Sequence, residues 1–226
     1  MLNTHKIELL RESLPFFNNL STKESESLIS KTILNTYKKG TIINDKNSIC
    51  TGLLIIISGQ FRAFISSPSG KEITLFKLLD RDICILSASC VFQNITYDVN
   101  LESESDSIAL IIEGSTIKNL SKSNIQVLEF LLKLTQNKLS EVMYVLEQSV
   151  FFNLDYKVSN FLIEESNLMN SNILNLTHEY IANHLGSSRE VISRVLKKFE
   201  KNKILKLSRG RIKILNLEEL SKICNN

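Results

Sequence analysis

Apolar residues recur along this chain with two different periods, and the change of period divides it. From residue 14 to about 112, short apolar runs are broken by turn-forming residues, as where Leu53–Ile57 meets Ser58 and Gly59. Similar runs lie at residues 41–43, 61–65, 73–76, 100–104 and 108–112. Many short strands at this spacing predict a β-roll or barrel, and residues 22–34 before it are expected to form a short helix.

From residue 115 to about 152 the apolar period becomes helical, and one stripe repeats at alternating intervals of four and three. Its members are Leu128, Leu132, Thr135, Leu139, Val142 and Leu146. This spacing is typical of a coiled-coil seam and predicts a parallel two-fold homodimer. The alternative is a helix that packs only on its own domain. A second apolar set, Leu131, Leu134 and Met143, is expected to face the roll.

Residues 154–226 are predicted to form a winged helix-turn-helix domain. A helix is expected over 158–165, another over 177–185, a turn at Gly186 and a longer helix over 187–202. Residues 204–215 then predict a hairpin around Gly210. The fold class is therefore α+β, with a β-roll over residues 1–114, a dimerisation helix over 115–153 and the winged domain over 154–226.

The helix over 187–202 is expected to have one apolar and one polar face. Val191, Ile192, Val195, Leu196 and Phe199 share one side, because residues three and four apart coincide at a period of 3.6. The opposite side carries Arg189, Glu190, Ser193, Arg194 and Lys197. Arginine binds guanine with two hydrogen bonds, and glutamate accepts one from cytosine. Ser187 and Glu190 could instead form a capping box, which leaves two roles open for Glu190.

The charge is concentrated on this part of the chain. Residues 186–213 hold ten basic and two acidic residues, a net charge of +8, and the remainder holds 17 basic and 22 acidic, a net charge of −5. Such a basic segment on an acidic body is expected where a protein meets a polyanion. We expect Ser193 and Lys197, with Arg209 and Arg211 at the hairpin tip, to contact phosphates.

The residues from Thr177 to Leu196 resemble the helix-turn-helix of the Crp/Fnr family, above all in Ser188-Arg189-Glu190 followed by Arg194. This resemblance implies base contacts by Arg189, Glu190 and Arg194, and phosphate contacts by Thr177 and Ser188. The glycine-punctuated strands resemble the family's effector-binding roll. The family resemblance implies a dimer on a palindromic double-stranded DNA site, with RNA polymerase as a further partner and activation as the more common outcome.

The segment over 82–98 departs from the cyclic-nucleotide-binding members, which hold ribose with a Gly-Glu pair and phosphate with an arginine. Ile85 and Leu86 occupy the Gly-Glu place, and the segment contains no arginine or glutamate. Because a cyclic phosphate needs a cation or several amides, we expect cyclic AMP not to bind. Arg81 replaces the usual glycine, which puts the path of this loop in question. Since no cysteine precedes Cys50, an Fnr-type iron–sulfur cluster is not expected either.

The effector is left unidentified by the sequence. The candidate pocket residues are Leu86, Ser87, Ala88, Ser89, Cys90 and Tyr97. Cys84 and Cys90 have three possible roles: buried packing residues, redox-active thiols, or neighbours of a haem-sized or other ligand. The four cysteines match no metal-binding spacing.

Other function classes find little support. The only histidines are His5, His178 and His184, none of which lies in the roll. No phosphate-binding glycine loop is present, so an enzyme is not expected. A roll that regulates a protein partner without DNA is the alternative, but it leaves the basic helix unexplained. The apolar runs are too short to span a membrane, and the first six residues contain no apolar signal segment, which predicts a cytoplasmic protein.

Overall fold

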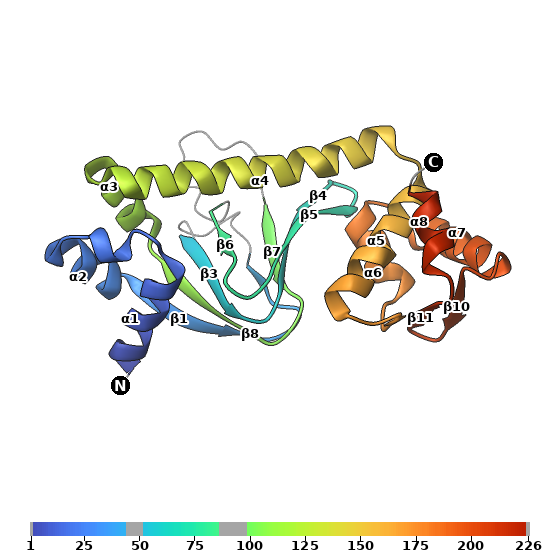
Figure 1. Cartoon of the computed structure of the whole chain (residues 1–226), viewed down its shortest axis with the longest axis horizontal. Helices are drawn as coiled ribbons and strands as arrows, with labels where there is room; N and C mark the ends of the chain where they lie inside the picture. The colour runs from blue at the N-terminus through green and yellow to red at the C-terminus, as the bar shows by residue number, and fades with distance from the viewer. Residues whose placement is uncertain (1, 44–51, 86–98, 225–226) are drawn as a thin grey trace. The chain divides into compact units, whose positions relative to one another are not determined.

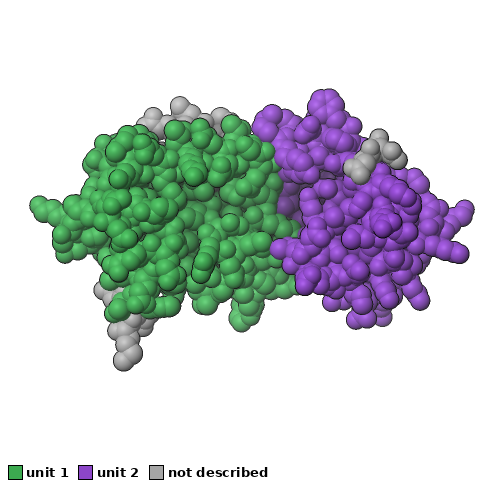
Figure 2. Space-filling model, in the orientation of Figure 1, with its two compact units in different colours: residues 1–65, 75–142 green, residues 66–74, 143–226 purple. Residues whose placement is uncertain are grey.

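A computed structural model describes residues 2–43, 52–85 and 99–224, and the chain divides into two compact units (Figure 1, Figure 2). The first unit comprises residues 1–65 and 75–142, and the second comprises residues 66–74 and 143–226. The α+β class is confirmed, with a β-roll, a long helix and a C-terminal winged helix-turn-helix. The domain boundaries expected at residues 114 and 153 stay predictions.

The elements of the roll and of the helices around it follow in chain order. They are α1 (Leu2–Ser13), the short 3-10 helix η1 (Phe17–Asn19), α2 (Thr22–Ser30), β1 (Thr32–Tyr37), β2 (Ile42–Ile43), β3 (Leu53–Ser58), β4 (Phe61–Ser66), β5 (Glu72–Leu78), β6 (Ile83–Cys84), β7 (Asn100–Ser103), β8 (Ser107–Ile112), α3 (Gly114–Ser123) and α4 (Ile125–Phe151). The strands form two four-stranded sheets, with the orders β1-β8-β3-β6 and β2-β7-β4-β5.

Strand β3 lies in the interior of the roll. Leu54 and Ile56 belong to a core that also contains Phe61 and Leu101 of the other sheet. Leu53 and Ile55 belong to a second core, in which the opposite face of the sheet meets helices. Burial on both faces explains why the sequence of β3 is a continuous apolar run rather than an alternating one.

The N-terminal part of the roll differs from the prediction. The helix expected over 22–34 ends at Ser30, and Thr32 begins a strand opposite Ile112 of β8. This prediction was wrong because the partner strand lies far away in sequence and no local signal records it. Helix α1 was not predicted, although its Leu10 is fully buried.

Arg81 adopts the left-handed backbone conformation (φ 74°), which suits the glycine that is usual at this position. Its backbone N–H donates to the carbonyl of Ile56 at 2.8 Å. The neighbouring carboxylate of Asp82 accepts a hydrogen bond from the backbone N–H of Leu79 at 2.8 Å. These bonds hold the turn at Leu79–Asp82 although glycine is absent. The path of residues 86–98, which the sequence put in question, lies outside the described residues.

The predicted helical stretch is two helices, α3 and α4, separated at Asn124. Leu131 is buried, and Leu134 packs partly against the core below the first sheet, as expected. Met143 was expected to face the roll but is 52% exposed. Val142 instead packs partly against the core between the sheets, because it precedes Met143 by one residue, or 100°, on the helix.

The second unit contains the elements after α4. They are α5 (Leu154–Met169), β9 (Ile173–Leu174), α6 (His178–Leu185), α7 (Arg189–Lys201), β10 (Leu205–Ser208), β11 (Arg211–Ile214) and α8 (Leu217–Ile223). One core joins them, with Leu162, Ile181, Leu196 and Ile212 each at most 1% exposed. The helix expected over 158–165 is longer in both directions. Across the described ranges, no helix is long and apolar enough to cross a membrane.

Candidate nucleic-acid interface

Helices α6 and α7 are joined by a tight turn with well-defined caps. Thr177 is the N-cap of α6, and its hydroxyl accepts a hydrogen bond from the backbone N–H of Tyr180 at 3.1 Å. Gly186 ends it in the left-handed conformation (φ 64°), and the N–H of Ser187 donates to the carbonyl of Ala182 at 3.0 Å. This bond is typical of helix ends at glycine. Because of this bond, Ser187 belongs to the end of α6, and α7 begins at Arg189, two residues later than predicted.

The N-cap of α7 is therefore Ser188, which excludes the alternative of a capping box that starts at Ser187. The Ser188 hydroxyl accepts the N–H of Val191 at 3.4 Å. Glu190 lies in the first helical turn, where a carboxylate is favoured by the helix dipole. A hydrogen bond from its own backbone N–H, the Ser188 hydroxyl and then the cations Arg189 and Arg194 lower the pKa of Glu190. Glu190 is consequently an exposed, ionised acceptor between two arginines.

The two faces of α7 are as the sequence predicted. Ile192, Val195, Leu196 and Phe199 are buried in the core of the unit, and Val191 is half-buried. The residues expected on the polar face are all accessible: Arg189, Glu190, Arg194 and Lys197 are exposed, and Ser193 is half-buried. Packing of the buried side therefore holds α7 in place. The opposite side presents guanidinium, carboxylate and ammonium groups.

His178 is a residue at this surface that the sequence analysis did not select. It is the first residue of α6 and is half-buried. Desolvation, followed by the charges of Arg189 and Lys197, lowers its pKa from the usual value of 6.5. The imidazole therefore lies close enough to two basic side chains of α7 to sense their charge. No local sequence signal shows this, because the neighbours lie on the next helix.

The hairpin expected over 204–215 is present as β10 and β11, joined by Arg209 and a left-handed Gly210 (φ 68°). Strand β9 adds a third strand through the pair of Leu174 with Ile212, which the sequence did not predict. Lys206 lies directly opposite Lys213, and both are exposed. Like charges in this position are unfavourable in a sheet. A bound polyanion would remove that cost.

Side-chain contacts tie the hairpin to its unit. Arg211 Nε donates to Asn175 Oδ1 at 3.3 Å, which orients one guanidinium at the hairpin tip. The carboxylate of Glu200 on α7 accepts the backbone N–H of Leu207 at 2.8 Å. Of the two acidic residues in the basic segment, Glu200 therefore serves the structure, and Glu190 is the one that remains on the exposed polar face.

The predicted pocket residues in the roll (Leu86, Ser87, Ala88, Ser89, Cys90 and Tyr97) lie outside the described residues. Cys84 is described and is fully buried in the core between the two sheets. Burial of this kind favours packing over redox chemistry among its three possible roles, because oxidation of a thiol requires access.

This geometry defines a winged helix-turn-helix unit that follows a sensor-type β-roll and a long helix. Two family models match the chain: a Crp-like helix-turn-helix domain over residues 156–223 and a cyclic nucleotide-binding domain over residues 34–124. A solved structure of a Crp/Fnr-family transcriptional regulator from Eubacterium rectale is 41% identical, covers 95% of this chain and 100% of that chain, and superposes with a TM-score of 0.91. The chain belongs to the Crp/Fnr family and is a DNA-binding transcription regulator.

More distant solved structures share the fold. FixK2 from Bradyrhizobium japonicum is 17% identical with a TM-score of 0.65, and covers 85% of this chain and 96% of that chain. The c-di-GMP-responsive regulator CLP from Xanthomonas campestris is 16% identical with a TM-score of 0.71, and covers 86% of this chain and 99% of that chain. No curated protein matches.

Proposed function

We propose that the protein is a homodimer that binds a palindromic DNA site and activates transcription in response to an effector other than cyclic AMP. The observation that carries this proposal is the exposed polar face of α7, where Arg189, Glu190 and Arg194 stand together on a helix fixed by its buried side. Each good bidentate contact to a base contributes about 1–3 kcal/mol of discrimination.

Arg189 and Arg194 supply the donors that guanine O6 and N7 require, and ionised Glu190 supplies an acceptor for the amino group of cytosine. The surrounding groups contact the DNA backbone and set the register of the helix in the major groove. They are Thr177, Ser188, Ser193, Lys197, Arg209 and Arg211. Thr177 and Ser188 each cap the N-terminus of a helix. The partial positive charge at such an N-terminus attracts phosphate.

The homodimer is supported by the predicted seam of α4. Its four leucines, Leu128, Leu132, Leu139 and Leu146, are between 47% and 60% exposed in the single chain. Large exposed apolar stripes on one helix are typical of association surfaces. Thr135 belongs to the same stripe and bonds back to the carbonyl of Leu131 at 2.8 Å. Two-fold pairing would bring two recognition helices to half-sites about 34 Å apart.

Activation and contact with RNA polymerase are proposed from family membership. Control by an effector in the roll is proposed from the predicted pocket, where residues 86–90 are small or weakly polar rather than cationic. A cation is the group that a cyclic phosphate most needs.

The test begins with selection of binding sequences from random double-stranded DNA by the full-length protein. The selected site is expected to be palindromic, with half-site centres about 10 base pairs apart. Arg189→Ala and Arg194→Ala should each weaken binding by about 1–3 kcal/mol and relax preference at one position of each half-site. Lys122→Ala, which also removes an exposed cation, is the matched control and should bind as the wild type does.

Selection of a non-palindromic site, or loss of affinity without loss of sequence preference in both arginine variants, would overturn the proposed base contacts. Reporter transcription with and without the selected site then separates activation from repression.

A further inference from the structure

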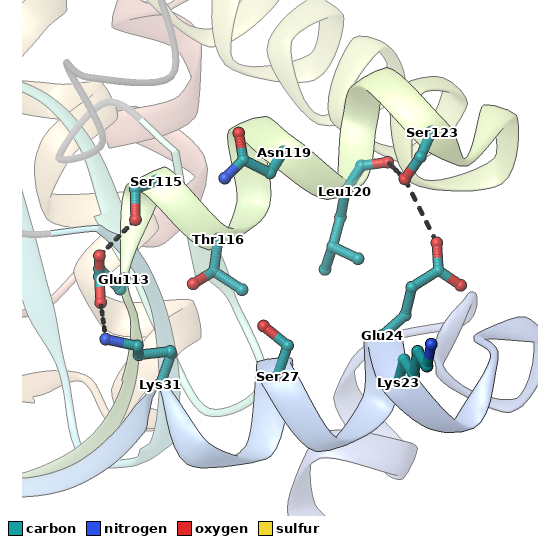
Figure 3. Close-up of a pocket in the computed structure, with 10 residues that line it drawn as sticks. All are labelled: Lys23, Glu24, Ser27, Lys31, Glu113, Ser115, Thr116, Asn119, Leu120 and Ser123. Carbon is teal, nitrogen blue, oxygen red and sulfur yellow. Dashed lines mark hydrogen bonds and ion pairs between the residues drawn. The ribbon is translucent and has the colours of Figure 1, made fainter.

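A polar groove lies between α2 and α3 of the first unit, with a volume of about 450 Å³ (Figure 3). Nine of the ten residues that line it are polar or charged, and only Leu120 is apolar. Two packed helices usually meet through apolar side chains. A groove lined in this way favours a hydrophilic occupant, and its volume lies in the range of small-molecule sites.

Each end of the groove is closed by a polar bridge from one helix to the other. At one end, the Glu113 carboxylate accepts the Ser115 hydroxyl and pairs with Lys31 at 3.3 Å. At the other end, the Ser123 hydroxyl donates to Glu24 at 3.3 Å. Hydrogen bonds lower the pKa of both carboxylates. The largest cause for Glu113 is the bond from Ser115, and for Glu24 it is the bond from the backbone N–H of Ser21, the N-cap of α2. Both carboxylates are therefore ionised and already engaged.

The middle of the groove has a different character. Thr116 is only 7% exposed, and its side chain is directed between the helices toward Ser27 (Figure 3). Within residues 2–43, 52–85 and 99–224, no hydrogen bond or ion pair engages the side chains of Thr116, Ser27, Asn119 or Lys23. The Thr116 hydroxyl is not among the fully buried side-chain atoms that lack a partner, so it opens into the groove, where water or a ligand satisfies it.

The unengaged groups define the chemistry of an occupant. Two hydroxyls and one amide offer both donors and acceptors, which suits a molecule with several hydroxyl groups. Lys23 contributes the one unpaired positive charge among these four groups, which suits a single anionic group such as a phosphate. From this arrangement we infer that the α2–α3 groove binds a small phosphorylated sugar or polyol, a site distinct from the DNA-binding surface and from the predicted roll pocket.

In this site, Thr116, Ser27 and Asn119 contact the hydroxyls of the ligand, and Lys23 contacts its phosphate. Leu120, which is 5% exposed, provides an apolar floor for the carbon skeleton. The two end bridges limit the length of the ligand, since they span the helices on either side of these groups.

The test uses isothermal titration calorimetry on the full-length protein, with glucose 6-phosphate and glycerol 3-phosphate as probes. Glucose and inorganic phosphate are titrated separately, so that the hydroxyl and anion contributions are distinguished. We expect at least one phosphorylated probe to bind about tenfold more tightly than either glucose or phosphate, because only the phosphorylated probe makes the charged contact and the hydroxyl contacts together.

Two variants assign the binding to the groove. Thr116→Val replaces the hydroxyl with a methyl group of similar size and should weaken the phosphorylated probe about 2- to 10-fold. Its thermal stability should not fall, because the hydroxyl loses no partner. Lys23→Met should weaken the probe about tenfold or more. Lys122→Met, which removes an exposed lysine of α3 that does not line the groove, should leave binding unchanged.

Three results would overturn the inference. The first is absence of a heat of binding from both phosphorylated probes, which would leave only water in the groove. The second is equal binding of inorganic phosphate, which would reduce the site to an anion contact. The third is binding that neither Thr116→Val nor Lys23→Met alters, which would place the ligand elsewhere.

Discussion

His178 gives DNA binding a dependence on pH that can be predicted with its sign. Burial and the charges of Arg189 and Lys197 lower its pKa below the usual 6.5, so the imidazole of the free protein is neutral at pH 7. Phosphates that approach Arg189 and Lys197 reverse the local potential and favour the imidazolium. DNA binding therefore takes up a proton at His178, and affinity rises as the pH falls.

The magnitude is limited by the number of groups that titrate. The chain has three histidines. Of these, His184 is 5% exposed, and its Nδ1 lies 2.9 Å from the carbonyl oxygen of Tyr180. Its environment is the core of the unit rather than the DNA-facing surface. One proton taken up at His178 changes the dissociation constant by at most tenfold per pH unit, about 1.4 kcal/mol.

The free energy of unfolding must follow the opposite trend. Because the pKa of His178 is lower in the folded chain than in the unfolded chain, the unfolded chain binds more protons as the pH falls below 6.5. His178 therefore does not lower the free energy of unfolding above pH 6.5. It lowers this free energy as the pH falls from 6.5 toward the pKa of His178 in the folded chain. Acidification should strengthen DNA binding and weaken the free fold through one imidazole.

Fluorescence anisotropy with the selected DNA site, at constant ionic strength between about pH 8 and about pH 5, measures the first effect. Chemical denaturation over the same range measures the second. His178→Asn should flatten both profiles relative to the wild type, and His5→Asn, a change in the first unit, should leave both unchanged. The reasoning is refuted if His178→Asn keeps the wild-type slope of affinity, or if wild-type affinity falls on acidification.

Four further predictions concern the dimer, the turn, the hairpin and the roll. Leu132→Glu with Leu139→Glu should convert a dimer to the 25.7 kDa monomer in analytical ultracentrifugation, since both side chains are more than half exposed in the single chain; a monomeric wild type would contradict the seam. Gly186→Ala should lower the free energy of unfolding in chemical denaturation by at least about 1–2 kcal/mol, because φ is positive and an added Cβ would overlap Cγ1 of Ile73. Asn175→Ala should weaken DNA binding only while Arg211 is present, so a double-mutant cycle without coupling would exclude its positioning role. Cyclic AMP should not raise the melting temperature of the full-length protein, and a clear rise would show that the roll binds it.

The helix-turn-helix was predictable because its signals are local. The alternation of buried and exposed positions on α7 follows from the 3.6-residue period, and Gly186 and Gly210 mark turns that require positive φ. The predicted helix start at Ser187 was wrong by a small margin. That error has a physical cause, since the bond from Ser187 to Ala182 belongs to the preceding helix.

The short strands β6 and β9 could not be predicted in the same way. Each has two residues, and each exists because of a partner elsewhere in the chain: Leu54 for Cys84, and Ile212 for Leu174. Pairing energy of this kind depends on topology, which the local pattern does not contain. The groove between α2 and α3 was likewise not predicted, because its two walls are about 90 residues apart in sequence.

Several placements in the second unit look unfavourable when the protein is considered alone. Lys206 faces Lys213 across the hairpin, Arg189 puts a positive charge at the start of α7, and His178 starts α6 beside two cations. Like charges across a sheet and cations at helix N-termini each cost a few tenths of a kcal/mol or more. Folded proteins tend to violate such local rules at functional sites. A bound polyanion would remove the electrostatic cost of all three placements. These charges lower the stability of the free protein, and DNA binding explains why they are present.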